Sequence, residues 1–123
     1  MSQNISQLAR ACRQASHHVA RLNSHQKNKT LHDMANYVLA EKKAILAANK
    51  KDIEKAKENG IPDAMMDRLV LNEQRLTGMA HALKDVASLN DPVGTIDNVR
   101  TRPNGIQVGQ MRIPLGVISI IYE

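Results

Sequence analysis

The feature that most restricts the fold of this chain is a nearly continuous apolar run close to its carboxyl end. The run is Val117-Ile118-Ser119-Ile120-Ile121-Tyr122, rich in β-branched residues and without polar alternation. A strand with one solvent-exposed face alternates apolar and polar residues, whereas the sequence of a strand buried on both faces is a nearly continuous apolar run. The run therefore predicts a strand of a parallel sheet that is covered on both faces. Such a strand needs neighbours, and we expect them to lie outside these 123 residues.

The residues before this run follow a helical period. Apolar residues spaced three and four apart predict a first helix from Ile5 to Leu22 and a second from Ser24 through Leu46. Helical patterning then continues to about Leu89. The charged stretch Lys50–Asn59 faces mostly solvent, because its opposite charges lie three or four residues apart. Five residues have the chemistry of helix caps, first turns or left-handed ends: Ser24, Asn49, Gly60, Pro62 and Asn72.

Extended structure is expected after a turn cluster at Asn90–Gly94. Pro103-Asn104-Gly105 suits a hairpin turn, because proline fixes φ and glycine readily takes positive φ. Strands of roughly Thr95–Arg102 and Ile106–Ile113 should pair across it. The apolar residues of the second strand change from one face to the other partway along it, which predicts a bulge at Gly109. A lone hairpin is only marginally stable in water and has strand edges without hydrogen-bond partners. We therefore expect the chain to self-associate through the hairpin.

Composition narrows the class of protein. The 123 residues allow one domain or part of one, and 42% apolar with 24% charged residues is an ordinary globular mix. No apolar run approaches the roughly 20 residues of a membrane-spanning helix, and the first residues do not resemble a secretory signal. The single cysteine, Cys12, cannot form an internal disulfide and fits a reducing compartment, so we expect the cytoplasm.

The residues by themselves predict no reaction. Cys12 lies on the apolar stripe of the first helix, where we expect it to be buried and inert. The five histidines lack the spacings that place two ligands on one helical face, so no metal site is predicted. No Gly-x-Gly-x-x-Gly or Walker-type loop is present. The formal net charge of +5 leaves open a basic helical module that binds nucleic acid or another protein, although opposite charges are interleaved along the helices.

Several motifs in this order are similar to those of one enzyme family: Asn49-Lys50-Lys51-Asp52, Asn59-Gly60-Ile61, Met66-Asp67-Arg68-Leu69, Leu71-Asn72-Glu73-Gln74-Arg75-Leu76, Asp91-Pro92-Val93-Gly94 and the run from Arg112 to Glu123. Together they resemble the gamma-glutamyl phosphate reductase family (glutamate-5-semialdehyde dehydrogenases) of the aldehyde dehydrogenase superfamily. The similarity covers nearly the whole chain. It implies that the chain is the N-terminal segment of such an enzyme.

The resemblance implies an α/β fold in which this chain supplies an incomplete part of an NADP-binding domain. Residues 1–92 would form a helical region, residues 93–113 an oligomerisation hairpin, and residues 114–123 the first strand of the dinucleotide-binding sheet. The implied activity is the NADPH-dependent reduction of L-glutamyl 5-phosphate, a small-molecule substrate, to L-glutamate 5-semialdehyde in proline biosynthesis. The family uses a cysteine thioester that accepts hydride.

The resemblance carries few site residues onto this chain. Cys12 does not match the family's catalytic cysteine, so no catalytic residue is assigned and the isolated chain is expected to be inactive. Ligands of open α/β sheets bind at the carboxyl ends of the strands. Ile121, Tyr122 and Glu123 approach that end of the predicted strand, and they are the candidate cofactor-binding residues. A specific nucleic-acid partner is not expected, because a finished binding module should not end in Val117–Ile121.

Overall fold

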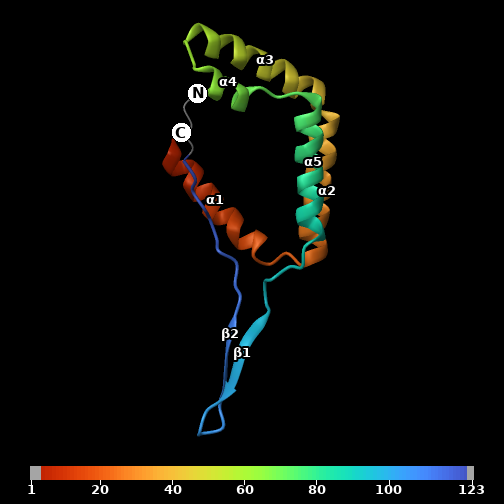
Figure 1. Ribbon diagram of the computed structural model, residues 1–123. Coiled ribbons are helices and arrows are strands. Elements are labelled where there is room, and N and C mark those ends of the chain that lie inside the picture. The colour runs from red at the N-terminus through yellow and green to blue at the C-terminus, as the bar shows by residue number, and fades with distance from the viewer. Residues whose placement is uncertain (1–3, 122–123) are drawn as a thin grey trace. The chain divides into compact units, whose positions relative to one another are not determined.

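A computed structural model describes residues 4–121, which divide into two compact units. The first unit contains the residues up to Ser24 together with those from Asn90 onward, and the second unit contains His25–Leu89. The described chain is mostly helical with one antiparallel pair of strands (Figure 1). The elements are α1 (Ile5–Val19), α2 (Ser24–Ala40), α3 (Lys42–Glu58), α4 (Asp63–Leu69), α5 (Glu73–Ser88), β1 (Ile96–Thr101) and β2 (Gln107–Met111).

The second unit has a core of small side chains. The buried apolar residues of the described chain all lie in α2, α3 and α5: Ala35, Ala56, Leu76, Ala80 and Ala87. Alanines allow helix axes to come close together, because no long side chain separates them. Lys42 Nζ and Glu73 Oε2, 3.0 Å apart, link the first turn of α3 to the first turn of α5. The absence of Phe and Trp from the sequence is consistent with this thin core.

Two predicted helix ends are confirmed. Gly60 follows the C-cap of α3 with a φ of +67°, a conformation that a residue without Cβ adopts at no steric cost. The amide of Ile61 donates to the carbonyl of Ala56, and that of Gly60 to Lys57, which is the Schellman pattern. At the start of α5, the side chain of Asn72 accepts from the amide of Arg75 at 2.7 Å.

Two other expectations in the helical region were wrong. The second helix does not run through to Leu46 but divides at Glu41, between α2 and α3. Asn49 is not a cap. It lies inside α3 with 7% of its surface exposed. Its Nδ2 donates to the carbonyl of Leu69 at 2.9 Å, and its Oδ1 accepts from the amide of Leu71 at 2.8 Å. Asn49 therefore ties α3 to the connection between α4 and α5.

The start of α2 also differs in detail from the expectation. Ser24 is the first residue of the helix, and its hydroxyl donates to Asp91 Oδ2 at 3.0 Å. Both residues belong to the first unit. The hydrogen bond therefore joins the end of its N-terminal segment, at Ser24, to the start of its C-terminal segment, which begins at Asn90. Among the described residues, no helix has both the length and the apolar character needed to cross a membrane.

Candidate functional site

The predicted cofactor-binding residues lie at the edge of what the structure describes. Ile121 is described and is 90% exposed, whereas Tyr122 and Glu123 lie outside the described residues. Residues 114–121 form no strand, and no backbone hydrogen bond joins them to another residue within 4–121. Val117, Ile118 and Ile120 are between 49% and 64% exposed. A strand requires a partner for its backbone, so the buried sheet strand stays a prediction.

The hairpin is formed as expected. Strand β1 pairs antiparallel with β2, and the register places Ile96 opposite Met111 and Thr101 opposite Gln107. The amide of Gly105, at a φ of +84°, donates to the carbonyl of Arg102 at 2.8 Å and closes the turn. Every residue of both strands is exposed within the described chain. Within residues 4–121 the hairpin thus leaves its apolar side chains and outer strand edges uncovered.

A bulge is present, but the expectation about which strand carries it was wrong. The register shifts between Asp97 and Arg100, so Asn98 and Val99 on β1 face the single residue Gly109 on β2. Asn98 takes a φ of +56°, which asparagine tolerates better than most residues with a Cβ. A Cβ on Gly109 would lie 2.8 Å from Ile96 Cγ2 and 3.2 Å from Val99 Cγ2. Gly109 is therefore the residue that lets the bulged strand approach closely.

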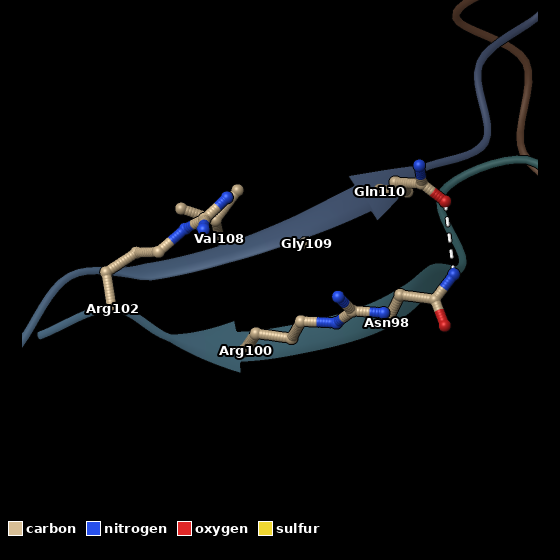
Figure 2. A pocket seen from close by; sticks show the side chains of 6 residues that line it. All are labelled: Asn98, Arg100, Arg102, Val108, Gly109 and Gln110. Carbon is tan, nitrogen blue, oxygen red and sulfur yellow. Dashed lines mark hydrogen bonds between the residues drawn. The ribbon is translucent and has the colours of Figure 1, made fainter.

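The bulge gives one side of the hairpin a shallow polar hollow of about 200 Å³ (Figure 2). Asn98 Nδ2 donates to Gln110 Oε1 across the strands at 3.1 Å. Arg100 and Arg102, two residues apart on the same chain segment, line the hollow together with Val108. Neither arginine forms an ion pair within residues 4–121, whereas Arg112 Nε lies 3.0 Å from Asp97 Oδ2. The hollow can therefore receive carboxylates from a partner.

A second hollow lies in the first unit, between α1 and the segment Ile113–Val117. Figure 1 shows this segment, in blue, passing beside α1, in red. This hollow is a groove with a volume of about 580 Å³, and Arg13 and His17, one helical turn apart on α1, are among the residues that line it. Its other wall includes Gly116, which has a φ of +90°. No acidic residue lines it.

Cys12 is exposed, so the expectation that α1 buries it within this chain was wrong. It lines a smaller hollow with Val19 and Leu115, on the apolar stripe of α1. The stripe is present as predicted, but no residue of α1 is buried. The described histidines, cysteine and acidic residues do not form a group of three that could hold a metal ion.

Sequence reasoning missed two features that the structure brings out. The left-handed Asn98 follows Asp97, and adjacent Asp and Asn are a known signal for irregular backbone, but the strand pattern concealed it. The charge is also less evenly spread than the interleaving suggested. No acidic residue precedes Asp33, and the five Lys and Arg residues before it account for the whole net charge of +5.

Comparison with known proteins finds sequences and structures similar to this chain, although no family model matches it. The chain is 52% identical over 120 residues to the gamma-glutamyl phosphate reductase of Salinibacter ruber and 48% identical over 123 residues to that of Citrifermentans bemidjiense. These matches cover 98% and 100% of this chain but only 28% and 29% of the relatives. The chain thus spans less than a third of the length of these relatives.

Solved structures give the same result. A gamma-glutamyl phosphate reductase from Thermotoga maritima matches with a TM-score of 0.85 and 32% identity, over 91% of this chain and 27% of that one. The enzyme from Saccharomyces cerevisiae matches with a TM-score of 0.83 and 30% identity, over 93% and 29%. The helices and hairpin therefore match one segment of each of these longer reductases. The resemblance to gamma-glutamyl phosphate reductases that the motifs indicated is confirmed along nearly the whole chain.

Proposed function

We propose that this chain acts as a segment of an NADPH-dependent reductase that converts L-glutamyl 5-phosphate to L-glutamate 5-semialdehyde, with release of phosphate, in the cytoplasm. The observation that supports this proposal most strongly is the 52% identity over 98% of the chain to a protein named for that activity. Identity at this level, spread over helices and hairpin alike, favours a shared role for the segment. The rival hypothesis of a self-contained basic module has no support from these relatives.

Within that enzyme, the segment would contribute to the cofactor side of the site. Ile121, Tyr122 and Glu123 follow the apolar run, and the carboxyl end of a sheet strand is where open α/β folds bind dinucleotides. The backbone of residues 114–121 has no ladder partner in the described chain, so it is free to pair with strands supplied by the remaining enzyme. NADP is the cofactor that this proposal assigns.

The hairpin would serve assembly. Its strands are exposed along their whole length, and Ile96, Val108 and Met111 are each at least 45% exposed. Apolar side chains of this size favour a partner surface, since burying each one completely contributes about 1.5–3 kcal/mol. We assign this partner to a second copy of the same protein, because two-fold contacts are the commonest closed arrangement.

The activity is tested by comparing the 123-residue chain with the product of the complete reading frame that contains it. Both are assayed in the reverse direction with glutamate 5-semialdehyde, NADP⁺ and phosphate. We expect turnover from the complete product and none from the chain, which has no matching nucleophile. A complete product that binds NADP⁺ but turns over neither this substrate pair nor L-glutamyl 5-phosphate would contradict the proposal. Turnover by the chain that is lost in Cys12→Ser would contradict the absence of a catalytic residue.

A further inference from the structure

We infer that Asn104, at the tip of the hairpin, is a site of spontaneous deamidation through a cyclic succinimide, and that the closed turn limits the rate. This reactivity depends neither on reductase activity nor on assembly. Asparagine is among the chemically labile residues of proteins. The reaction is intramolecular, so the residue that follows each asparagine and the local backbone decide which asparagine reacts.

The sequence narrows the choice to two asparagines. Asn59-Gly60 and Asn104-Gly105 are the two places where glycine follows asparagine, and every other asparagine precedes a residue with a Cβ. That carbon and its substituents crowd the amide nitrogen that must attack, and glycine lacks them. The local structures of these two positions distinguish them.

The reacting atoms at the hairpin tip are the Gly105 amide nitrogen and the side-chain carbon Cγ of Asn104. Once the amide proton passes to hydroxide, the nitrogen attacks Cγ and closes the succinimide ring. The Cγ–Nδ2 bond breaks, and Nδ2 takes up a proton and leaves as ammonia. Water then opens either carbonyl of the ring, which gives aspartate or isoaspartate. Nothing is oxidised or reduced, and the product carries a negative charge where Asn104 was neutral.

The hairpin tip gives the reaction space and a polarised carbonyl. Asn104 and Gly105 are exposed, and no atom of the described chain lies within 4 Å of the position that a Cβ on Gly105 would occupy. Asn104 Oδ1 accepts a hydrogen bond from the Ile106 amide at 3.2 Å. This bond draws electrons from Cγ and favours nucleophilic attack. It joins residues two apart in the sequence, so it does not require the hairpin to be closed.

The closed turn holds the nucleophile back. The Gly105 amide donates to the carbonyl of Arg102 at 2.8 Å, and the Arg102 amide donates to the carbonyl of Ile106 at 2.8 Å. A hydrogen-bonded amide proton does not pass to base until the bond opens. Both strands are exposed along their length, so opening of the hairpin uncovers no buried side chain. The population of the open hairpin therefore sets the rate at Asn104.

Asn59-Gly60 is a matched comparison within the same chain. At the end of α3, the Gly60 amide donates to the carbonyl of Lys57 at 3.0 Å, and the Ile61 amide donates to that of Ala56 at 3.1 Å. Ala56 is only 9% exposed, so opening of this helix end disturbs the core of the second unit. Opening therefore costs more free energy than at the hairpin, and Asn59 should react more slowly.

The test is a time course of the full 123-residue chain in mildly alkaline buffer made with H₂¹⁸O, followed by tryptic peptide mapping by mass spectrometry. Digestion in ordinary water ensures that only deamidation during the incubation carries the label. The tryptic peptides of residues 58–68 and 101–112 contain one asparagine each. We expect Asn104 to react about tenfold faster than Asn59 in the folded chain, and the two rates to become similar in concentrated guanidinium chloride. Equal rates in the folded chain, or aspartate without isoaspartate, would overturn the proposal.

Two glycine-to-alanine variants test whether the turn limits the rate. Gly109→Ala, whose Cβ would lie 2.8 Å from Ile96 Cγ2, should open the hairpin and raise the rate at Asn104 severalfold, with Asn59 unchanged. Gly78→Ala, the matched change within α5, should leave the rate at Asn104 unchanged.

Hydrogen exchange of the Gly105 amide measures the opening of the turn directly. Across the parent chain, both variants and graded concentrations of guanidinium chloride, the rate at Asn104 should rise in proportion to this exchange rate. A rate at Asn104 that stays constant while exchange of the Gly105 amide accelerates would show that the turn does not limit the reaction.

Discussion

Replacing Asn49 with alanine gives the sharpest test of how the second unit is held together. The substitution removes a donor to the carbonyl of Leu69 and an acceptor for the amide of Leu71, with hydrogen bonds of 2.9 and 2.8 Å. Asn49 is only 7% exposed, so water can replace these partners only in part. Each backbone group left without a partner costs about 1–3 kcal/mol. Alanine recovers about 0.5 kcal/mol through its higher helix propensity.

The two groups together cost about 2–6 kcal/mol. After the recovery of about 0.5 kcal/mol, the expected net loss of unfolding free energy is about 1.5–5.5 kcal/mol, which lowers the urea midpoint by roughly 1 M or more. The assay is urea denaturation followed by far-ultraviolet circular dichroism, with hydrogen exchange at the Leu71 amide as a local readout. Lys51→Ala, an exposed change two residues further along the same helix, is the matched control and should shift the midpoint very little. If the unfolding free energy of Asn49→Ala lies within about 0.5 kcal/mol of that of the parent chain, and the Leu71 amide is still protected, Asn49 does not tie α3 to the connection between α4 and α5.

Three further outcomes are expected. Gly109→Ala should destabilise the hairpin by about 1–3 kcal/mol, because its Cβ would lie 2.8 Å from Ile96 Cγ2; retained cross-strand NOEs would contradict this. Gly78→Ala, in the middle of α5 with nothing within 4 Å of the new Cβ, should instead raise stability by about 0.5–1 kcal/mol in the same denaturation assay. The hydrogen bond and charge of Asp33 raise the pKa of Lys29, so the pair stabilises the folded chain while Lys29 is protonated. This stabilisation is lost as the pH rises above about 10.5. Asp33→Asn should lower the pKa of Lys29 in an NMR titration, and an unchanged pKa would exclude the pairing.

The features that the sequence predicted correctly are those whose cause is local. Gly60 can end α3 because the left-handed conformation is a property of that one residue, and Asn72 caps α5 through an amide only three residues away. The turn at Pro103-Asn104-Gly105 follows from fixed and positive φ values in adjacent residues. In each case the partner atoms lie within a few residues along the chain.

The features that the sequence did not predict depend on distant partners. Asn49 has the chemistry of a cap, and only the position of Leu69 and Leu71, about 20 residues away, makes it a buried clamp. The bulge was placed on the wrong strand because Gly109 is the visible irregularity, while the extra residue lies opposite it on β1. Cys12 was expected to be buried because the period of a helix identifies an apolar face but not what covers it.

The balance between buried and exposed apolar residues shows why the first unit needs a covering surface. The buried apolar residues of the described chain belong to the second unit, and four of the five are alanines. In the first unit, Leu8 and Val19 of α1 are more than half exposed, as are Ile118 and Ile120 further along the chain. Burying apolar surface contributes about 25 cal/mol of stabilising free energy per Å². Covering these side chains of the helix and the extended segment with another surface would therefore be favourable. The relatives contain more than three times the matched length, and in them such a surface can come from outside the matched segment. The proposed assembly through the hairpin can therefore be tested separately, because pairing of the hairpin with a second copy should depend on protein concentration, whereas covering of residues 114–121 within one longer chain should not.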